Sequence, residues 1–555
     1  MVRGVMELIN QHTKKIMEGC KDHARAAGLR FQDESLEYIV TNRDLLELSP
    51  KMMIPTLYDY WVHDVEVLKQ RGKYELYPGN PYETVINTRP AISFYNDNNP
   101  DWLNVMIFYH VLGHIDFFQN NIYFQHTWDY DFTGQALSDK RVIARLRAEK
   151  NKWVDYVIEF ARGIDNLVGY HKTLSKPEQV VLNGQSSKLN FYFDVFLQSI
   201  LNVRINDYVK KIERYNRCIE EHGETGETSF FNEVEKKHPE FEALFQKSLK
   251  EKPKGHRDLL QFLLAHSEFL NKEENEWMKT VIQIVRKTSL FFQPQIRTKI
   301  MNEGWASYWH ERLFLKDERI KGHEVDFARV NAAVTSLPRV GLNPYALGMR
   351  LFIEIREMAD KGRYNFDFQR LLDARAREAF DAKTGQGEAF LFAVRQNCCD
   401  AMFVSTFLSQ EFMNRYNLFV AGKRLNSQKM VWEYYIQSRD VEDYKKMLQD
   451  TLYHPPHITI KNETSGKSEL YLIHHFEGKP LVKEFIANTM MGIEYLWGRP
   501  VKLETSEVVS EAQPQPDTGS SGPASPLPAP QEASELVWRR VVYTMENRKL
   551  SKQEL

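Results

Sequence analysis

The stretch that decides the fold is NPDWLNVMIFYHVLGHIDFFQNN at residues 99–121. Apolar residues dominate it, and Pro100 and Asp101 supply a helix start, so the pattern predicts a buried helix over 102–120. His110 and His114 are four residues apart. On a helix their rings stack on one face and can converge on one metal ion.

A third ligand has to come from another segment, and NEGWASYWHE at residues 302–311 offers two. Glu303 and His310 are two helical turns apart, on one face of a helix predicted over 298–316. The rise of roughly 10 Å between them makes it difficult for both to bind a single ion. We therefore expect Glu303 to be the third ligand.

Two His and one carboxylate around an open position suit Zn²⁺ as a hydrolytic Lewis acid, and equally suit non-haem Fe²⁺. The usual motif, H-E-x-x-H, has a Glu after the first His as general base, whereas this chain has Val111 there. A hydrolase would need another base, and His310 and Asp116 are the candidates. A scaffold or regulator with a structural ion, or with polar packing alone, is the alternative reading.

Longer motifs resemble a known family. HVLGHIDFFQNN at 110–121 and KIMNEGWASYWHERL at 299–313 resemble the signature segments of the SpoVR family, named for stage V sporulation protein R. Shorter matches, which extend the resemblance over most of residues 5–505, are FQPQ at 292–295, NPYALG at 343–348 and YLWGRPV at 495–501. The resemblance implies a bacterial cytoplasmic protein linked to spore cortex formation, or to stress and stationary-phase physiology. It also implies two partners, a PrkA-type serine kinase and a von Willebrand-A-like protein, because members of the family are often encoded near the genes of these two proteins.

A second, shorter likeness concerns the segment EGWA at 303–306. It is similar to the third-ligand helix of some zinc peptidase-like families, in which a His pair binds the ion together with the Glu of EGWA. This likeness implies a zincin-like pair of helices with His110, His114 and Glu303 as the metal ligands. An intact trio with further titratable residues is more than a scaffold requires, and it favours a zinc-dependent hydrolase of amide bonds as the function.

Composition narrows the class of protein. With 555 residues and 42% hydrophobic content, the chain can bury a large core and form two or more domains. Its 73 basic and 75 acidic residues give no net field that would attract nucleic acid or an anionic membrane. No apolar run approaches the roughly 20 residues of a membrane-spanning helix. Four Cys without C-x-x-C spacing, and no signal-peptide pattern, predict a cytoplasmic protein.

The chain up to residue 425 is predicted to be one mainly helical domain that carries both motifs. Helical spacing of apolar residues covers 5–27, 33–48, 51–70, 102–120, 135–172, 193–222, 256–286 and 298–316, while 83–95 suggests short strands and 220–240 a charged connection.

A different pattern begins near residue 430. Strands at 431–436, 457–462, 469–476 and 501–505 and helices at 440–451 and 480–497 give the order β-α-β-β-α-β, which predicts a ferredoxin-like α+β module over 426–505. His474 and His475 are neighbours on one of these strands, so they face opposite sides and cannot chelate one ion together. Residues 506–534, rich in Pro, Gly and Ser and without Lys or Arg, predict a disordered linker. Residues 535–555 are expected to return as an edge strand and a tail.

Overall fold

The structure is a computed structural model. It describes residues 7–32, 34–41, 83–88, 90–127, 132–168, 221–250, 258–426, 431–453, 455–461, 469–476, 480–509 and 537–555, with scattered residues between 188 and 218. The chain divides into two compact units, one comprising Met1–Val168 with Leu259–Leu555 and the other Gly169–Asp258. The sequence patterns did not predict this division.

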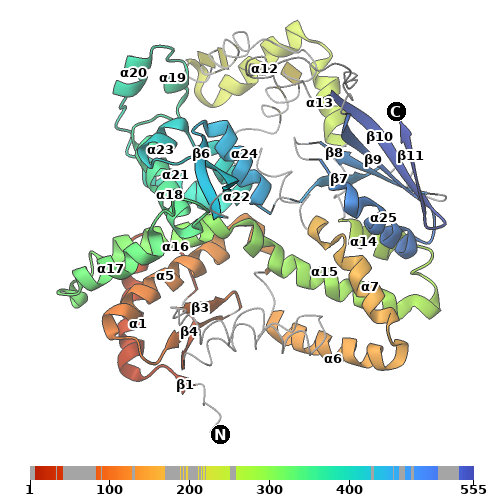
Figure 1. Ribbon diagram of the computed structural model, residues 1–555. Coiled ribbons are helices and arrows are strands. Elements are labelled where there is room, and N and C mark those ends of the chain that lie inside the picture. The colour runs from red at the N-terminus through yellow and green to blue at the C-terminus, as the bar shows by residue number, and fades with distance from the viewer. Residues whose placement is uncertain are drawn as a thin grey trace, which may run out of the picture. The chain divides into compact units, whose positions relative to one another are not determined.

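Two buried helices, α5 (Asp101–Asn120) and α16 (Lys299–Phe314), pack side by side in the larger unit (Figure 1). Both agree with the helices predicted over 102–120 and 298–316. Every residue of α5 from Leu103 to Phe118 is buried, as expected for a helix that is apolar all round. The two backbones approach closely at Gly113, where a Cβ would lie 2.8 Å from the Cα of Ala306.

A third helix, α18 (Pro344–Asp360), packs against α16 at a second glycine contact. A Cβ on Gly304 would lie 2.4 Å from the backbone of Gly348, so any larger side chain would force these helices apart. Asn343 caps α18 by accepting hydrogen bonds from the first backbone N–H groups, and Pro344 occupies the first helical position.

A four-stranded sheet packs against α5. Its order is β1 (Glu7–Leu8), β2 (Ser35–Val40), β4 (Ala91–Asn96) and β3 (Glu83–Ile86), with β2 and β4 parallel. The strands expected within 83–95 are confirmed. The helix predicted over 33–48 is wrong in its described part, because residues 35–40 form β2. There the buried Glu37 makes ion pairs with Lys14 and Lys21 of the neighbouring α1 (Gln11–Ala26). Residues 51–70 lie outside the described part of the chain.

Helices make up most of the other described residues of the larger unit before residue 420, which confirms the mainly helical character predicted there. The predicted helix over 135–172 is divided in two, because Asn151 adopts a left-handed conformation with φ 52°. In the described residues of the larger unit, the remaining α-helices of six or more residues are α6 (Phe132–Lys150), α7 (Trp153–Arg162), α14 (Leu259–His266), α15 (Glu276–Arg297), α17 (Glu324–Thr335), α20 (Ala374–Ala379), α21 (Gly387–Asn397), α22 (Asp400–Phe407), α23 (Gln410–Arg415) and, after residue 420, α24 (Val441–Thr451) and α25 (Lys483–Trp497).

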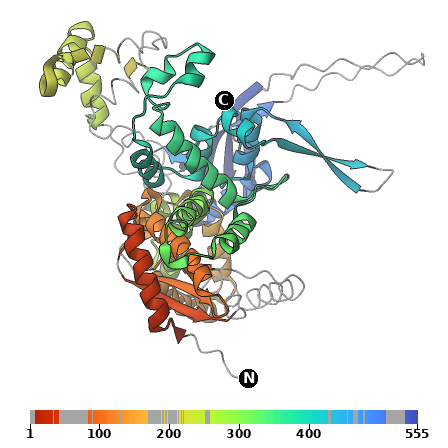
Figure 2. The same ribbon diagram turned by 90° about the vertical axis from the view of Figure 1, so that its left-hand side faces the viewer.

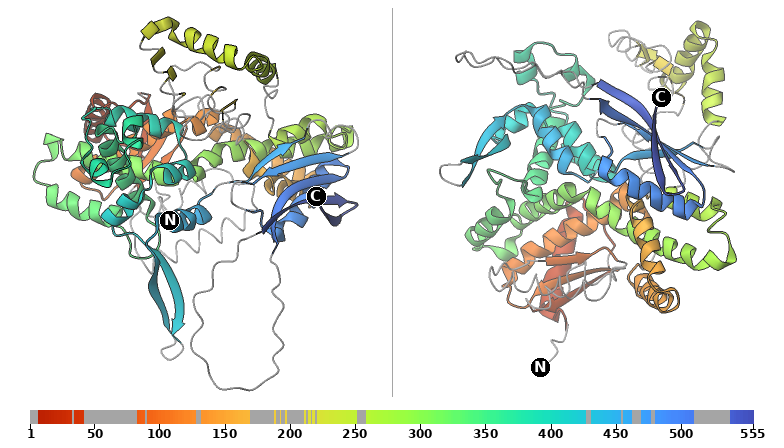
Figure 3. Two further views of the ribbon diagram at one scale, coloured as in Figure 1. Left: turned by 90° about the horizontal axis from the view of Figure 1, so that it is seen from above. Right: turned by 45° about the vertical axis from the view of Figure 1, so that its right-hand side comes forward.

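The C-terminal sheet contains five strands in the order β11-β10-β9-β8-β7 (Figure 3). Their bounds are β7 (His457–Ile460), β8 (Leu470–His475), β9 (Val501–Val509), β10 (Val537–Glu546) and β11 (Lys549–Glu554). Helix α25 connects the parallel strands β8 and β9, and its apolar residues share one core with the sheet and with α7, α14 and α15.

The predicted ferredoxin-like arrangement is wrong at its first strand. The chain order β-α-β-β-α-β is present, but β6 (Val431–Ser438) pairs with β5 (Val420–Asn426) in a separate two-stranded hairpin (Figure 2). The predicted edge strand after the linker is also corrected, since β10 pairs with β9 on one side and β11 on the other. Strand β9 continues to Val509, inside the linker predicted over 506–534; residues 510–536 lie outside the described residues.

The smaller unit, Gly169–Asp258, has its own aromatic core, which includes Tyr192, Phe196, Phe230 and Phe241. Two of its helices are α12 (Gly226–Lys237) and α13 (Phe241–Lys250), so the expected charged connection over 220–240 is wrong for most of its length. Its apolar residues Phe230, Phe231 and Val234 are buried on one face of α12. Across the described residues of both units, the helices are all too short or too polar to cross a lipid bilayer.

Candidate metal centre

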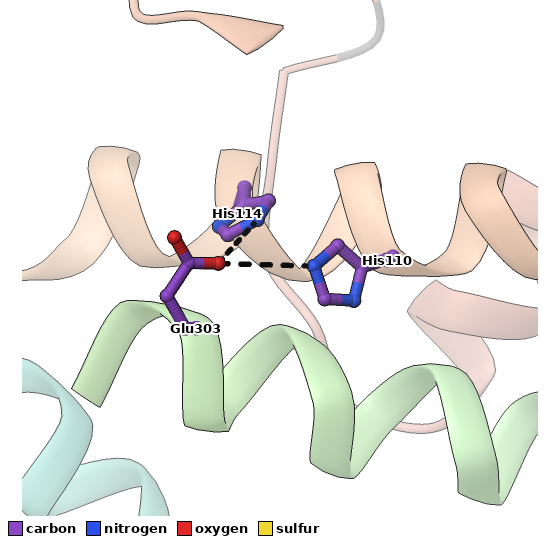
Figure 4. Close-up of side chains that lie close together, drawn as sticks. All are labelled: His110, His114 and Glu303. Carbon is purple, nitrogen blue, oxygen red and sulfur yellow. Dashed lines mark ion pairs between the residues drawn. The ribbon is translucent and has the colours of Figure 1, made fainter. Parts of the chain in front are cut away.

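His110 and His114 lie one turn apart on α5, and their rings meet edge to face with centroids 4.7 Å apart. Glu303 reaches them from α16, as Figure 4 shows. Its Oε2 atom lies 3.5 Å from Nε2 of His114 and 4.0 Å from Nε2 of His110. One possible ligand atom from each residue lies within 4.8 Å of the other two. The structure therefore brings together three of the site residues that the sequence analysis singled out.

The arrangement fits a divalent metal ion. Ligand atoms about 2.1 Å from a tetrahedrally coordinated ion lie roughly 3.4 Å from one another, close to the two separations from Glu303. Oε2 of Glu303 is buried and accepts no hydrogen bond from the residues that the structure describes. Burying an ionised oxygen without a partner is costly, and a cation would supply that partner.

A neighbour of Glu303 determines which ring nitrogen of a neutral His114 carries the proton. Nδ1 of His114 lies 2.9 Å from Oδ1 of Asn302, an oxygen that can only accept a hydrogen bond. Nδ1 therefore carries the proton, and Nε2, which faces Glu303, carries the lone pair. Metal-binding His residues are commonly oriented in this way, by a hydrogen bond from the nitrogen that does not bind the ion.

A longer chain of hydrogen bonds fixes His110. Asn331 of α17 donates from Nδ2 to Glu311 at 2.7 Å, so its Oδ1 accepts from Nε2 of His310 at 2.8 Å. A neutral His310 with its proton on Nε2 has an acceptor at Nδ1. Nδ1 of His110, 2.8 Å away, must therefore donate to it. The lone pair of His110 is then on Nε2, the atom that faces Glu303.

Burial keeps the imidazoles of His110 and His310 neutral. It lowers the pKa of His110 well below its usual value, and the nearby rings of His114 and His310 lower it further. Burial also lowers the pKa of His310 to about 4, although the hydrogen bond with Asn331 acts in the opposite direction. Neutral rings are the form that can bind a metal ion.

Aromatic side chains restrict the ring planes of His110 and His114. The ring of His110 stacks on Tyr345 of α18 at a centroid distance of 5.9 Å and an angle of 18°. The ring of His114 stacks on Phe118, one turn further along α5, at 6.0 Å and 14°. Each imidazole thus has one hydrogen bond and one stacking partner that restrict its rotation.

The helix that carries Glu303 is capped by a residue from another helix. Asp400, the first residue of α22, accepts hydrogen bonds from the backbone N–H groups of Ile300 and Met301 at 2.8 and 2.9 Å. Burial raises the pKa of Asp400 to about 7, while these hydrogen bonds act to lower it. The contact satisfies two N–H groups at the start of α16 that have no partner within the helix.

The other two predicted site residues are placed differently. His310 is fully buried and contacts His110 through Nδ1, on the ring edge that does not face Glu303. Asp116 does not join the cluster. Its Oδ1 accepts from the backbone of Arg30 at 2.7 Å, and its Oδ2 accepts from Trp305 at 2.8 Å and lies 3.4 Å from Nε of Arg395. Burial raises the pKa of Asp116, and Arg395 opposes that shift.

Several residues that shape the site were not predicted. Asn302 is adjacent to Glu303 in the sequence, and its position could have suggested a role beside the ligand. Glu311 lies within the motif at 299–313, but its contact with Asn331 joins two helices, and Asn331 and Asp400 belong to no motif. Val111, in the position that Glu holds in H-E-x-x-H, is fully buried in the main core of the larger unit.

Comparisons with known proteins agree with the motifs. The model of the family described as SpoVR like protein matches residues 7–455. The chain belongs to the SpoVR family. The matched range contains α5, α16, α17 and α18, and therefore every residue of the cluster and its hydrogen-bonded neighbours. It ends before β7, so the segment YLWGRPV at 495–501 lies outside it.

One curated relative is "Uncharacterized protein YcgB" of Escherichia coli (strain K12). It is 23% identical over 401 residues, which is 69% of this chain and 69% of the relative. No solved structure matches the chain. The comparisons thus assign the family.

Proposed function

We propose that this protein binds one divalent transition-metal ion through His110, His114 and Glu303 and is a metal-dependent hydrolase. The observation that supports this most strongly is the pair of hydrogen-bond arrangements behind the His ligands. In both arrangements the proton of the neutral imidazole lies on Nδ1, so the lone pairs on Nε2 of His110 and His114 face the carboxylate of Glu303. Simple polar packing does not require two imidazoles to be oriented toward one carboxylate oxygen.

His110, His114 and Glu303 would hold the ion, and Zn²⁺ held there would supply Lewis-acid chemistry for hydrolysis. Amide bonds are the substrate class we propose, by analogy with the EGWA-containing peptidases. Because Val111 cannot accept a proton, the chain supplies no base in the usual position. We assign His310 the role of a positioning residue that acts through His110, and Asp116 the role of an anchor for Trp305 and Arg395.

Non-haem iron is the second candidate, and Val111 is the observation that favours it. Two His and one carboxylate with open positions are typical of Fe²⁺ enzymes that activate oxygen, and these do not need a Glu after the first His. Scaffold function with a structural ion is the remaining alternative. It predicts that loss of the ion changes stability and nothing else.

The biological setting is proposed from family membership alone. We propose a cytoplasmic role in sporulation, including spore cortex formation, or in bacterial stress physiology, in keeping with the family name. A PrkA-type serine kinase and a von Willebrand-A-like protein remain the predicted partners.

Metal content tests the site. Purified protein, reconstituted with Zn²⁺ or with Fe²⁺ under anaerobic conditions, should hold about one equivalent by inductively coupled plasma mass spectrometry. His110→Ala, His114→Ala and Glu303→Ala should each lose it. His12→Ala, at an exposed position on α1, is the matched control and should keep it. Unchanged metal content in all three site variants would remove the proposed centre.

Labelled water tests the reaction. The zinc-loaded protein is incubated with a mixture of bacterial peptides and cell-wall fragments in water enriched in the heavy isotope of oxygen. A hydrolase should place heavy oxygen at new carboxyl ends, and Glu303→Ala should not. Oxygen uptake by the iron-loaded protein would favour the second candidate, and inactivity of both forms together with retained metal would favour the scaffold.

A further inference from the structure

A pocket of about 720 Å³ lies where α7, the end of α25 and the turn between β10 and β11 come together (Figure 1). Helix α25 packs against α7 on one side and contacts β10 on another. The volume falls within the range of small-molecule binding sites. The residues of the metal centre do not line this pocket, so it calls for a separate explanation.

One wall of the pocket is a continuous row of aromatic rings. Trp153, Tyr156 and Phe160 follow one another along α7, because residues three and four apart share a face of a helix. Ring centroids are 5.6 Å apart between Trp153 and Tyr156 and 6.5 Å apart between Tyr156 and Phe160. Tyr495 of α25 continues the row at 5.2 Å from Phe160, and Phe269 follows at 5.5 Å from Tyr495. The part of the row on α7 is straight and roughly 10 Å long.

The outer end of this row is open to solvent. Trp153 is 49% exposed and Tyr156 is 45% exposed. Single exposed apolar residues are common on protein surfaces, but these two rings are adjacent and continue into a pocket. Large exposed rings of this kind are the side chains that most often contribute the binding energy of a recognition site.

The rim of the pocket carries charges of both signs. Its charged side chains are Lys152, Glu494, Arg499, Glu546 and Arg548. Arg499 is paired with Glu268, which lies outside the lining. The other four are two cations and two carboxylates, so the rim has no excess of charge that would select an ion. A nucleic acid strand would need such an excess of cations for its phosphates. All of these groups can, however, form hydrogen bonds with the hydroxyl groups of a neutral ligand.

Arg548 lies at the rim on a turn that would be less strained with glycine. Glu546 pairs with Lys549, so Asn547 and Arg548 form a two-residue turn between β10 and β11. Both have a positive φ, 51° and 61°, as a type I′ turn requires, and Asn-Gly is strongly preferred in such turns. The backbone N–H of Arg548 donates to Oε2 of Glu494 at 3.0 Å. An arginine here costs conformational free energy, and strain of this kind is concentrated at functional sites.

We propose that this pocket binds a neutral oligosaccharide with an extended, β-linked chain. The face of an aromatic ring carries partial negative charge, which attracts the C–H groups on the flat face of a pyranose ring. A straight row of aromatic rings suits a chain whose sugar rings follow one another in a line. The sugar hydroxyl groups would accept hydrogen bonds from Arg548 and Lys152 and donate them to Glu494 and Glu546. This site is independent of the proposed metal centre, and its test does not depend on metal content.

Cellopentaose and chitopentaose are the test ligands, titrated into the full-length protein by isothermal calorimetry. Maltopentaose, whose α-linked chain curves, is the comparison. We expect saturable binding of at least one β-linked chain, and roughly tenfold weaker binding of maltopentaose because a curved chain cannot cover both exposed rings. Trp153→Ala and Tyr156→Ala should each weaken binding at least about tenfold. The matched controls, Trp432→Ala and Tyr434→Ala, remove rings that are 55% and 57% exposed on the β5–β6 hairpin and should leave affinity unchanged.

Arg548→Gly separates a role in binding from a role in folding. Glycine adopts a positive φ without strain, so the thermal midpoint should not fall by more than a few degrees. Affinity for the oligosaccharide should nevertheless fall about three- to tenfold, because a charged hydrogen-bond donor is lost. Unchanged affinity in Arg548→Gly would overturn the role of this side chain.

The other outcomes bear on the ligand itself. Absence of saturable binding by both β-linked chains, or unchanged affinity in both Trp153→Ala and Tyr156→Ala, would overturn the site, as would an equal loss in the hairpin controls. Equal binding of maltopentaose would overturn the extended chain. Tighter binding of oligothymidylate would overturn the proposal in favour of a nucleic acid strand. A dimer in analytical ultracentrifugation that Trp153→Ala dissociates would overturn it in favour of a second copy of this chain.

Discussion

Gly113→Ala is the sharpest test of how the metal centre is built. The added Cβ would lie 2.8 Å from the Cα of Ala306 and 3.3 Å from its Cβ. Carbon atoms prefer separations of about 3.5–4.0 Å, so α5 and α16 would have to separate locally by roughly 0.7–1.2 Å. Overpacking of this kind costs about 1–3 kcal/mol of folding free energy.

The same displacement should disrupt metal binding, because the ligands come from both helices. Metal–ligand distances tolerate deviations of about 0.2 Å, less than the expected separation. We therefore expect Gly113→Ala to weaken metal affinity roughly 10–100-fold, the range seen when groups that position ligands are lost. Competition with a chelator of known affinity measures this change, and urea unfolding of the metal-free protein measures the loss of stability.

Two further variants control this experiment. Gly163→Ala is the matched substitution at the end of α7, where the nearest atoms to the new Cβ are 3.5 and 3.6 Å away and φ is −59°, so it should change neither quantity. Adding Ala306→Gly to Gly113→Ala removes only the 3.3 Å contact and should restore only part of both losses. A Gly113→Ala protein with wild-type stability and wild-type metal affinity would refute the argument.

Three other substitutions give separate tests. Asn331→Leu breaks the hydrogen-bond chain behind His110 and should weaken metal affinity about 10–100-fold with the fold retained. Asn397→Leu, at a half-buried helix end, is the control and should leave metal affinity unchanged; equal affinities of the two variants would contradict the positioning role. Burial raises the pKa of Asp400 to about 7 in the folded protein, whereas the pKa in the unfolded chain is about 3.9. Between these two pH values the folded protein therefore binds more protons than the unfolded chain. Its free energy of unfolding should fall as the pH rises through this range, by at most about 4 kcal/mol. Asp400→Asn should flatten that fall in urea unfolding, and an unchanged slope would contradict it. Replacing 510–536 with Asn-Gly should keep the thermal midpoint within a few degrees, because the flanking residues already pair across β9 and β10; loss of cooperative unfolding would show that the segment is needed.

The grouping of His110, His114 and Glu303 could be predicted because these residues have local signatures. His110 and His114 are fixed by helical spacing, and Glu303 is a charged residue among aromatic neighbours. The residues that hydrogen-bond to the site and to its helices could not be predicted. Asn331 and Asp400 make these contacts only when helices distant in sequence pack together. Local patterns likewise do not reveal which glycines lie at contacts between helices.

The errors in the fold have similar causes. Residues 35–40 contain apolar residues compatible with either a helix or a strand, and pairing with β4, which is distant in sequence, decides in favour of the strand. The β-α-β-β-α-β order was read correctly, but order along the chain does not specify which strands are neighbours. Strand β6 follows β5 closely and pairs with it, which leaves the C-terminal sheet to be completed by β10 and β11.

The late position of β10 has a consequence for biosynthesis. Val541, Tyr543 and Met545 belong to the same core as α7, α14 and α15, which leave the ribosome hundreds of residues earlier. Until β10 emerges, β9 has one unpaired edge, and that core lacks part of its apolar filling. Nascent chains generally fold from the N-terminus onward, and unpaired strand edges attract other chains. The core of this half is therefore completed only when β10 has been synthesised, whereas α5 and α16 can already pack together.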